Sequence, residues 1–313
     1  MKKFFAVALI LVLALTMCGT VFAADKKPVV GLVMKSLSNE HFKKMEEGVR
    51  KYTEEDGSYE LIARGMNSET DIDTQISIIE NFIAQGIDVM CIAPADSMGI
   101  APFVKKAIDA GIVVVNFDNP LDKKALVDNG LPEDFVYVGP NDEYGAYLVA
   151  KYMGETLGKG SKVILLEGSP GADNARQRQN GFLQGVEETG LVVLADQTAH
   201  WEIEEANTVL TNLLTIHGDE VQGVITAADG MAVGAIKALE AAGLGGKVLV
   251  SGYDNQDQVR PLLLEDKLAA TVDQFGATNA YEAIKVGIRI LNGEKLSGWI
   301  KTPSELVTKK DLK

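Results

Sequence analysis

Cysteine and histidine are scarce in this sequence, and their scarcity excludes two classes of protein. The 313 residues include two cysteines and three histidines. Cys18 lies in an apolar N-terminal segment, and Cys91, inside an apolar run, cannot form an internal disulfide alone. His41, His200 and His217 lack the spacing of metal ligands. We therefore expect neither a disulfide-stabilised domain nor a metal site, and we expect Cys91 to fill the core.

Basic residues are outnumbered by acidic ones. The chain has 30 Lys and Arg against 44 Asp and Glu, a net charge of −14. Removing residues 1–23 takes away Lys2 and Lys3 and no acid, which leaves 28 basic residues and a net charge of −16. This charge argues against nucleic acid or an anionic membrane surface as a partner.

Long apolar runs are absent outside the N-terminus. Residues 1–23 have the charged start, apolar stretch and small-residue cleavage site of a secretory signal peptide cleaved after Ala23. We therefore expect an exported protein, which the resemblance described below places in the periplasm. A transmembrane anchor is an alternative, although the stretch is short. Lipid anchoring at Cys18 is another, although Met17 fits poorly the small residue that precedes a lipoprotein cysteine.

Enzyme motifs are also missing. The sequence has neither a Gly-x-Ser-x-Gly elbow nor a phosphate-binding loop ending in Gly-Lys-Ser/Thr. The turn at 168–171, Gly-Ser-Pro-Gly, lacks the third glycine of a dinucleotide fingerprint. The histidines suggest no nucleophile–base pair. We predict a binding protein without enzymatic activity and without a cofactor.

What the chain does contain is a regular alternation of apolar strands and amphipathic helices. The expected strands are 29–34, 59–63, 89–92, 112–117, 135–138, 162–166, 191–195, 223–226, 248–251 and 268–272. The expected helices are 39–53, 71–85, 97–110, 142–157, 175–189, 206–215, 231–242 and 278–291, with a polar loop at 122–134. Such alternation indicates parallel, doubly wound α/β sheets.

The two halves of the chain repeat each other. Residues 92–98 (Ile-Ala-Pro-Ala-Asp-Ser-Met) align with 225–231 (Ile-Thr-Ala-Ala-Asp-Gly-Met), and Gly48 and Gly181 occupy equivalent helix positions. A repeat of this length means two copies of one α/β unit. Asp96 and Asp229 align, and we expect both to cap the helices that follow them.

Polar and aromatic residues follow the strands. Ligands bind outside the carboxyl ends of strands in such sheets, where Asp118 and Asp254 stand in the two repeats. The candidate ligand-binding residues are Lys35, Asn39, His41, Phe42, Asp118, Asn119, Ser169, Arg176, Trp201, Asp254 and Gln274. These groups can hydrogen-bond hydroxyls and cover the C–H faces of a sugar. Structural roles remain open: a turn cap for Asp118, packing for Phe42 and Trp201, a surface ion pair for Arg176.

Together these residues resemble the periplasmic sugar-binding proteins of the ribose, allose and galactose group. The resemblance covers about 28–312 and is carried by residues 33–39, 116–118, 167–178, 228–232, 252–254 and 267–274. It implies two Rossmann-like lobes with parallel sheets, joined by three hinge crossings, that close on one sugar and pass it to a membrane permease. The implied lobes are 24–139 plus 275–302 and 140–274 plus 303–313, in a monomer.

The chain departs from this group at several positions. His41 stands where an aromatic ring is usual, and Asn119 where the ribose type has arginine. Ala93 and Ala228 replace asparagines of the ribose type and leave more room. A pyranose or a cyclic polyol is therefore favoured over ribofuranose. Lys35 looks like the lysine of the allose-type branch. Together with Arg176 it keeps an acidic sugar open as an alternative ligand.

Other functions remain as alternatives. An exported enzyme could use Asp118 and Asp254 as an acid/base pair on sugars. A sensor could present the sugar to a membrane receptor instead of a permease. A transcription repressor shares the two-lobe core, but the chain lacks an N-terminal helix-turn-helix.

Overall fold

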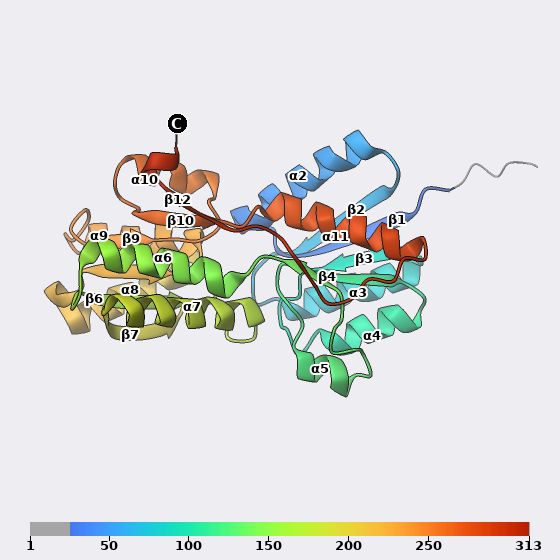
Figure 1. The fold of residues 1–313 in the computed structure, drawn as a ribbon, viewed down its shortest axis with the longest axis horizontal. Coiled ribbons are helices and arrows are strands. Elements are labelled where there is room, and N and C mark those ends of the chain that lie inside the picture. The colour runs from blue at the N-terminus through green and yellow to red at the C-terminus, as the bar shows by residue number, and fades with distance from the viewer. Residues whose placement is uncertain (1–25, 313) are drawn as a thin grey trace, which may run out of the picture.

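Two α/β lobes lie side by side in the computed structural model, which describes residues 26–312 (Figure 1). The expected signal peptide, with Cys18, lies outside the described residues. The first lobe contains β1 (Val29–Ser36), α2 (Glu40–Asp56), β2 (Glu60–Met66), α3 (Ile72–Gln85), β3 (Val89–Ile92), α4 (Ala101–Asp109), β4 (Val113–Phe117), α5 (Lys123–Asp128), β5 (Tyr137–Gly139), α11 (Gly276–Leu291) and β11 (Trp299–Lys301).

The second lobe repeats this plan. It contains α6 (Asp142–Leu157), β6 (Lys162–Glu167), α7 (Asp173–Thr189), β7 (Val192–Thr198), α8 (Ile203–His217), β8 (Gly223–Thr226), α9 (Asp229–Ala241), β9 (Leu249–Ser251), α10 (Arg260–Leu264), β10 (Ala270–Asp273) and β12 (Glu305–Thr308). Short 3₁₀ turns lie at Gly218–Glu220, Asp257–Val259 and Lys309–Asp311.

Each sheet has six strands. The strand order is β11-β5-β4-β3-β1-β2 in the first lobe and β12-β10-β9-β8-β6-β7 in the second. All pairings are parallel except that of β10 with β12. The chain passes between the lobes three times, after β5, after β10 and after β11. The predicted fold class, two similar doubly wound lobes, is confirmed.

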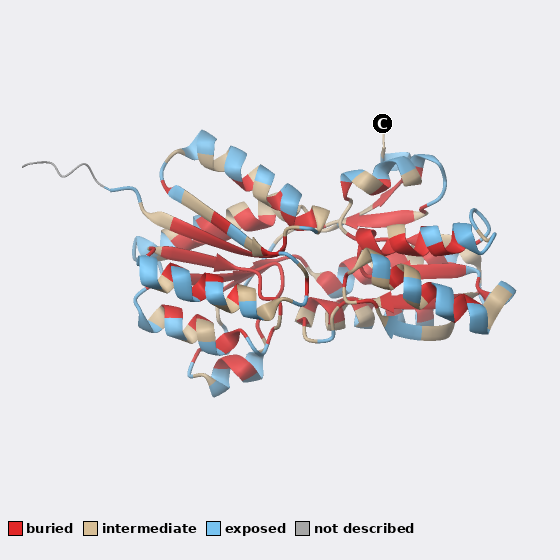
Figure 2. Cartoon of the chain, turned by 180° about the vertical axis from the view of Figure 1, so that it is seen from behind, coloured by how far each residue is buried: buried red, intermediate tan, exposed pale blue. Residues whose placement is uncertain are grey.

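The strands read as continuous apolar runs because helices cover both faces of each sheet. Successive side chains of a strand point to opposite faces. In β1, Leu32 joins one buried cluster with Phe42 of α2, whereas Val33 joins another with Phe82 of α3. Figure 2 shows the buried strands between helices that are exposed on their outer sides. Cys91 of β3 is buried as expected, and burial raises the pKa of its thiol.

The predicted repeat extends to helix packing. A Cβ at Gly48 of α2 would lie 2.5 Å from Ala277 Cβ in α11, and one at Gly181 of α7 would lie 2.1 Å from the Glu143 carbonyl oxygen in α6. Glycine is therefore required at both equivalent positions, because the paired helices approach too closely for any side chain. In the described part of the chain, no helix is long and apolar enough to cross a membrane.

Three local predictions are corrected by the structure. The expected loop at 122–134 contains the short helix α5. The helix expected from residue 97 begins at Ala101, because Oδ1 of Asp96 accepts hydrogen bonds from the Met98 and Gly99 N–H groups and caps the turn before it. Asp229 is not an N-cap. It is the first residue of α9, and its buried carboxylate instead binds the Gln256 N–H and the Thr271 hydroxyl, each at 2.7 Å.

Candidate ligand-binding site

Equivalent aspartates stand at the carboxyl ends of the two sheets. Asp118 directly follows β4 and Asp254 lies three residues after β9. Their φ angles are 62° and 113°, in a region that residues other than glycine rarely adopt. Both side chains are buried, 3% and 4% exposed. Strained backbone held by a rigid scaffold is typical of functional sites, and here it presents both carboxylates to one pocket.

That pocket lies between the lobes and brings together eight of the eleven predicted residues. They are Lys35, Asn39, His41, Phe42, Asp118, Trp201, Asp254 and Gln274. Its lining is completed by Glu69, Asn174, Arg178 and Ala228. The cavity is narrow, about 20 Å³, close to the room that one water needs. A larger ligand therefore requires the lobes to part and some of these side chains to turn.

The first lobe contributes a buried ion pair. Lys35, near the end of β1, places its Nζ 3.0 Å from Glu69 Oε2, and Asn39 donates to Glu69 Oε1 over 2.9 Å. The lysine Nζ also lies 5.7 Å from the centre of the Phe42 ring and 5.1 Å from that of Trp201, within cation–π range. Lys35 is thus held by a carboxylate and two aromatic rings.

Trp201 reaches the pocket from the second lobe because a glycine makes room for it. A Cβ at Gly168 would lie 2.1 Å from the indole ring. The Trp201 Nε1, the Asn174 Oδ1 and the Gln274 Oε1 are buried and make no hydrogen bond within the described residues. Buried polar groups are nearly always paired. These three atoms are therefore available to a ligand, one as a donor and two as acceptors.

Arg178 of α7 is the most constrained cation in the site. Its Nε donates to Asp142 over 2.7 Å, its Nη1 donates to the Ala227 carbonyl over 2.7 Å, and that nitrogen lies 3.6 Å from Asp254. Its guanidinium packs 3.7 Å from the centre of the Tyr253 ring. Burial raises the pKa of Asp142 to about 6 despite the opposing charge of Arg178. These contacts fix Arg178 facing the pocket.

His41 lies between the aspartates of the two lobes. Its Nε2 is 3.1 Å from Asp118 Oδ1, and its Nδ1 is 4.0 Å from Asp254 Oδ1. Burial disfavours the charged imidazole, but the attraction of Asp254 and the hydrogen bond with Asp118 outweigh it and raise the pKa of His41. Burial likewise works against ionised Asp118, yet its contact with His41 and the nearby charges of Lys35 and Arg178 lower its pKa.

Arg176, one of the predicted ligand-binding residues, does not line the pocket. It is partly exposed and pairs with Asp173 and, at 3.7 Å, with Asp122. Residues of an α-helix advance by 100° each, so Arg176 and Arg178 point in nearly opposite directions. The helical register, counted from the buried positions of α7, could have identified Arg178 as the inward residue.

Asn119 and Ser169 also lie outside the pocket lining. The amide of Asn119 is fully buried and donates to the Pro94 carbonyl over 2.6 Å. Its Oδ1 accepts from the Asn174 N–H of the other lobe over 3.0 Å, so it joins the lobes instead of facing the cavity. Ser169 lies in the turn after β6, where its carbonyl accepts from the Ala172 N–H.

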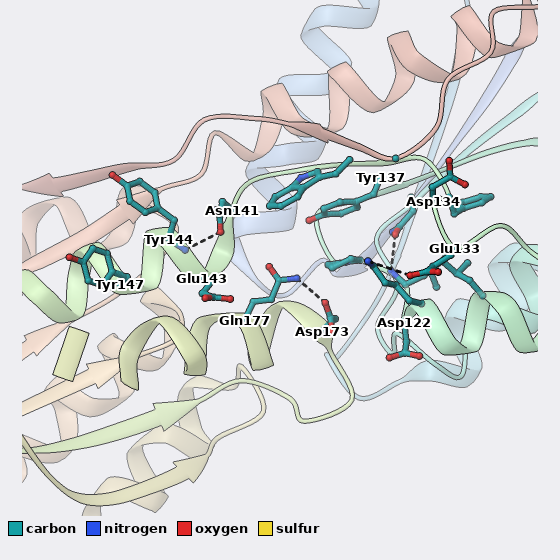
Figure 3. A pocket seen from close by; sticks show the side chains of 18 of the residues that line it. Asp122, Glu133, Asp134, Tyr137, Asn141, Glu143, Tyr144, Tyr147, Asp173 and Gln177 are labelled. Atoms are coloured by element: carbon teal, nitrogen blue, oxygen red, sulfur yellow. Dashed lines mark hydrogen bonds and ion pairs between the residues drawn. The ribbon is translucent and has the colours of Figure 1, made fainter. Parts of the chain in front are cut away.

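A second, larger cavity of about 1190 Å³ opens elsewhere along the lobe junction. Figure 3 shows Tyr144 and Tyr147 of α6, Tyr137 of β5 and several carboxylates around it. Tyr144 is 51% exposed, and none of the eleven predicted residues lines this groove. The smaller pocket is the candidate ligand site, because the buried charges of both lobes converge there.

Comparison with known proteins identifies the family of this chain. Residues 30–295 match the family described as periplasmic binding protein domain. The chain is a member of the periplasmic binding protein family. Its resemblance to the ribose- and allose-binding group, expected from the sequence, is confirmed.

Three relatives within the family illustrate this placement. The D-ribose/D-allose-binding protein of Pseudomonas aeruginosa is 39% identical, over 98% of this chain and 99% of its own. An ABC transporter periplasmic solute binding protein of Actinobacillus succinogenes, solved with bound D-allose, is 36% identical with a TM-score of 0.85, covering 91% of this chain and 99% of its own. A Bacillus halodurans solute binding protein with bound myo-inositol is 26% identical with a TM-score of 0.81, covering 92% and 97%.

Proposed function

We propose that this chain is the solute receptor of an ABC sugar transporter and binds one monosaccharide or cyclic polyol between its lobes. The observation that carries the proposal is the pairing of Asp118 and Asp254, from opposite lobes, in one buried pocket. Carboxylates accept hydrogen bonds from hydroxyl groups, each worth about 1.5–3 kcal/mol when charge-assisted. Phe42 and Trp201 supply apolar faces for the C–H groups of a ring.

Binding in this proposal works by closure of the lobes around the ligand. Two hydrogen bonds already join the lobes: the Ser97 N–H donates to the Gly171 carbonyl over 2.9 Å, and the Glu69 N–H donates to the Glu202 side-chain carboxylate over 3.2 Å. A ligand that contacts both lobes adds affinity only to the closed state and shifts the population toward it. The aspartates of the two lobes are the groups placed to do so.

A pyranose or a cyclic polyol is favoured over ribofuranose as the ligand on which the lobes close. Ala228 lines the cavity without a hydrogen-bonding group, so it leaves more width for a six-membered ring once the lobes have parted. Two similar proteins, solved with bound D-allose and with bound myo-inositol, support a ligand of hexose or inositol size. An acidic sugar is less well supported, because Lys35 already pairs with Glu69 and Arg178 with Asp142.

The proposal includes the setting of the protein. Residues 1–23 direct export to the periplasm and are removed after Ala23, and the mature chain acts as a monomer. Its partners are a carbohydrate and the membrane permease of the transporter. Nucleic acid is not a partner, because the chain carries 14 more negative than positive charges.

A thermal-shift screen tests the proposal. The mature protein is heated with pentoses, hexoses, polyols and sugar acids, and a ligand that binds only the folded state raises the melting temperature by mass action. We expect the largest shifts from D-allose, related hexoses and inositols. Mass spectrometry after long incubation checks the enzyme alternative, for which a product must appear. No shift with any neutral sugar would contradict the proposed function.

A further inference from the structure

The ligand pocket contains more buried carboxylates than permanent cations. The charged groups that line it, apart from the histidine, together with Asp142, which pairs with Arg178 from outside the lining, are Lys35, Arg178, Glu69, Asp118, Asp142 and Asp254. Asp229, which lies behind Asp254, is left out of this balance, since burial and the charge of Asp254 raise its pKa well above the usual value. Burial also raises the pKa of Asp254, but the charges of His41 and Arg178 and the hydrogen bond from Gln274 oppose this shift and favour the carboxylate. Two cations therefore face four carboxylates. Buried charges are costly unless they are paired, so the pocket requires further positive charge.

His41 is placed to supply that charge to both lobes. It belongs to α2 of the first lobe, as does its partner Asp118 at the end of β4, whereas Asp254 belongs to the second lobe. The distances from its two ring nitrogens are 3.1 Å and 4.0 Å to these carboxylates. A neutral imidazole can donate through only one nitrogen, whereas an imidazolium donates through both.

The charged groups that face the imidazole decide when it is protonated. They are Asp118 from β4, Asp254 from the loop after β9 and Arg178 from α7, while Lys35 of β1 acts on Asp118. The carboxylates favour the imidazolium, and burial and Arg178 oppose it. When the lobes part, Asp118 stays beside His41 but Asp254 leaves with the second lobe. Closure therefore adds the electrostatic attraction between the Asp254 carboxylate and the imidazolium of His41, which the open protein lacks.

We propose that His41 takes up a proton as the lobes close and that its imidazolium, bridging Asp118 and Asp254, couples sugar capture to proton uptake. This inference rests on the proposed function for its sugar-binding consequence.

The sign of the effect follows from the direction of the shift. A histidine whose pKa is higher in the closed state than in the open state favours closure fully below the open-state pKa. This advantage is lost as the pH rises through the closed-state pKa of His41, which its carboxylate partners raise. The affinity for a neutral sugar should therefore fall as the pH rises through this interval, by about tenfold for each unit by which closure raises the pKa.

The test combines NMR with calorimetry. The sequence has three histidines, so the imidazole resonances can be titrated in the mature protein and that of His41 assigned with the His41→Phe variant. The Asp254→Asn variant removes the partner from the second lobe. Calorimetry then measures the affinity for D-allose, or for the best neutral sugar of the screen, from pH 6 to 9 in buffers of different ionisation heat. His217→Gln, which changes a histidine at the end of α8, is the control.

We expect the His41 pKa to rise when a neutral sugar saturates the protein, to rise less in Asp254→Asn, and sugar binding to take up a fraction of a proton. We also expect that His41→Phe binds with an affinity nearly independent of pH, whereas His217→Gln behaves as the wild type. A His41 pKa that does not rise on saturation with the sugar overturns the proposal. An identical pH profile in wild type and His41→Phe overturns it as well. Failure of every neutral sugar to bind contradicts the proposed function, whereas sugar binding without proton uptake contradicts only the role of His41.

Discussion

Arg178 and Asp142 form a buried ion pair in which the arginine Nε donates to the carboxylate over 2.7 Å. The two residues come from neighbouring helices, α7 and α6, and the pair holds the guanidinium beside Asp254. The partly exposed Arg176, two residues earlier on the same helix, pairs at the surface. The two arginines therefore provide a matched comparison of a pocket residue and a surface residue.

Arg178→Gln should lower stability and abolish sugar binding, whereas Arg176→Gln should do neither. Removing one partner of a buried pair leaves the other charge uncompensated, at a cost of about 3–5 kcal/mol. An exposed pair contributes about 0–1 kcal/mol. Urea unfolding and calorimetry measure the two effects. If both variants lost affinity equally, Arg176 would contribute to binding as much as Arg178. The assignment of Arg178 alone to the ligand site would then be contradicted.

Ser97→Ala should weaken binding without touching the ligand pocket. The Ser97 hydroxyl accepts a hydrogen bond from the Asp173 N–H of the other lobe over 2.9 Å. A net hydrogen bond is worth about 0.5–1.5 kcal/mol, so the affinity should fall by about 2- to 12-fold through a less populated closed state. The control is Ser77→Ala, whose hydroxyl binds only the Asp73 carbonyl within α3. If the two variants bind sugar equally well, the contact does not support closure.

The Lys35–Glu69 pair gives a test of coupling within the pocket. Lys35→Met leaves the buried Glu69 carboxylate without its cation and should destabilise the protein by about 3 kcal/mol or more. The double variant Lys35→Met/Glu69→Leu removes both charges and should recover most of that loss. Urea midpoints of the two single variants and the double variant measure the interaction. Additive losses would show that the two side chains do not stabilise each other.

The architecture is predictable from the sequence because its signals are periodic. The bounds of the buried strand 89–92 agree with the prediction to the residue, since four apolar residues between helical patterns have few other interpretations. The internal repeat pairs Asp118 with Asp254, because both follow the same strand of the repeated unit. Element ends are less predictable: α4 begins at Ala101 and not at 97, because the side chain of Asp96 stabilises a separate turn first.

The composition of the site is only partly predictable, because it depends on side-chain direction. Position at the carboxyl end of a strand was enough to place Lys35 and Gln274 in the pocket lining. It fails for Asn119, whose buried side chain joins the two lobes instead of facing the cavity. It also fails for Arg176, which lies two helix positions before Arg178 and therefore points to the surface. Glu69 lies in a polar loop that shows no periodicity, so only its contact with Lys35 identifies it.

Calorimetric titration of D-allose, or of the best sugar from the screen, into wild type, Asp118→Asn and Asp254→Asn tests the central claim most directly. Asp128→Asn, at the exposed end of α5, serves as the control. Each pocket variant loses a charge-assisted acceptor worth about 1.5–3 kcal/mol, so its affinity should fall by about 10- to 150-fold while the control binds normally. Wild-type affinity in both Asp118→Asn and Asp254→Asn would contradict the placement of the sugar between the two lobes.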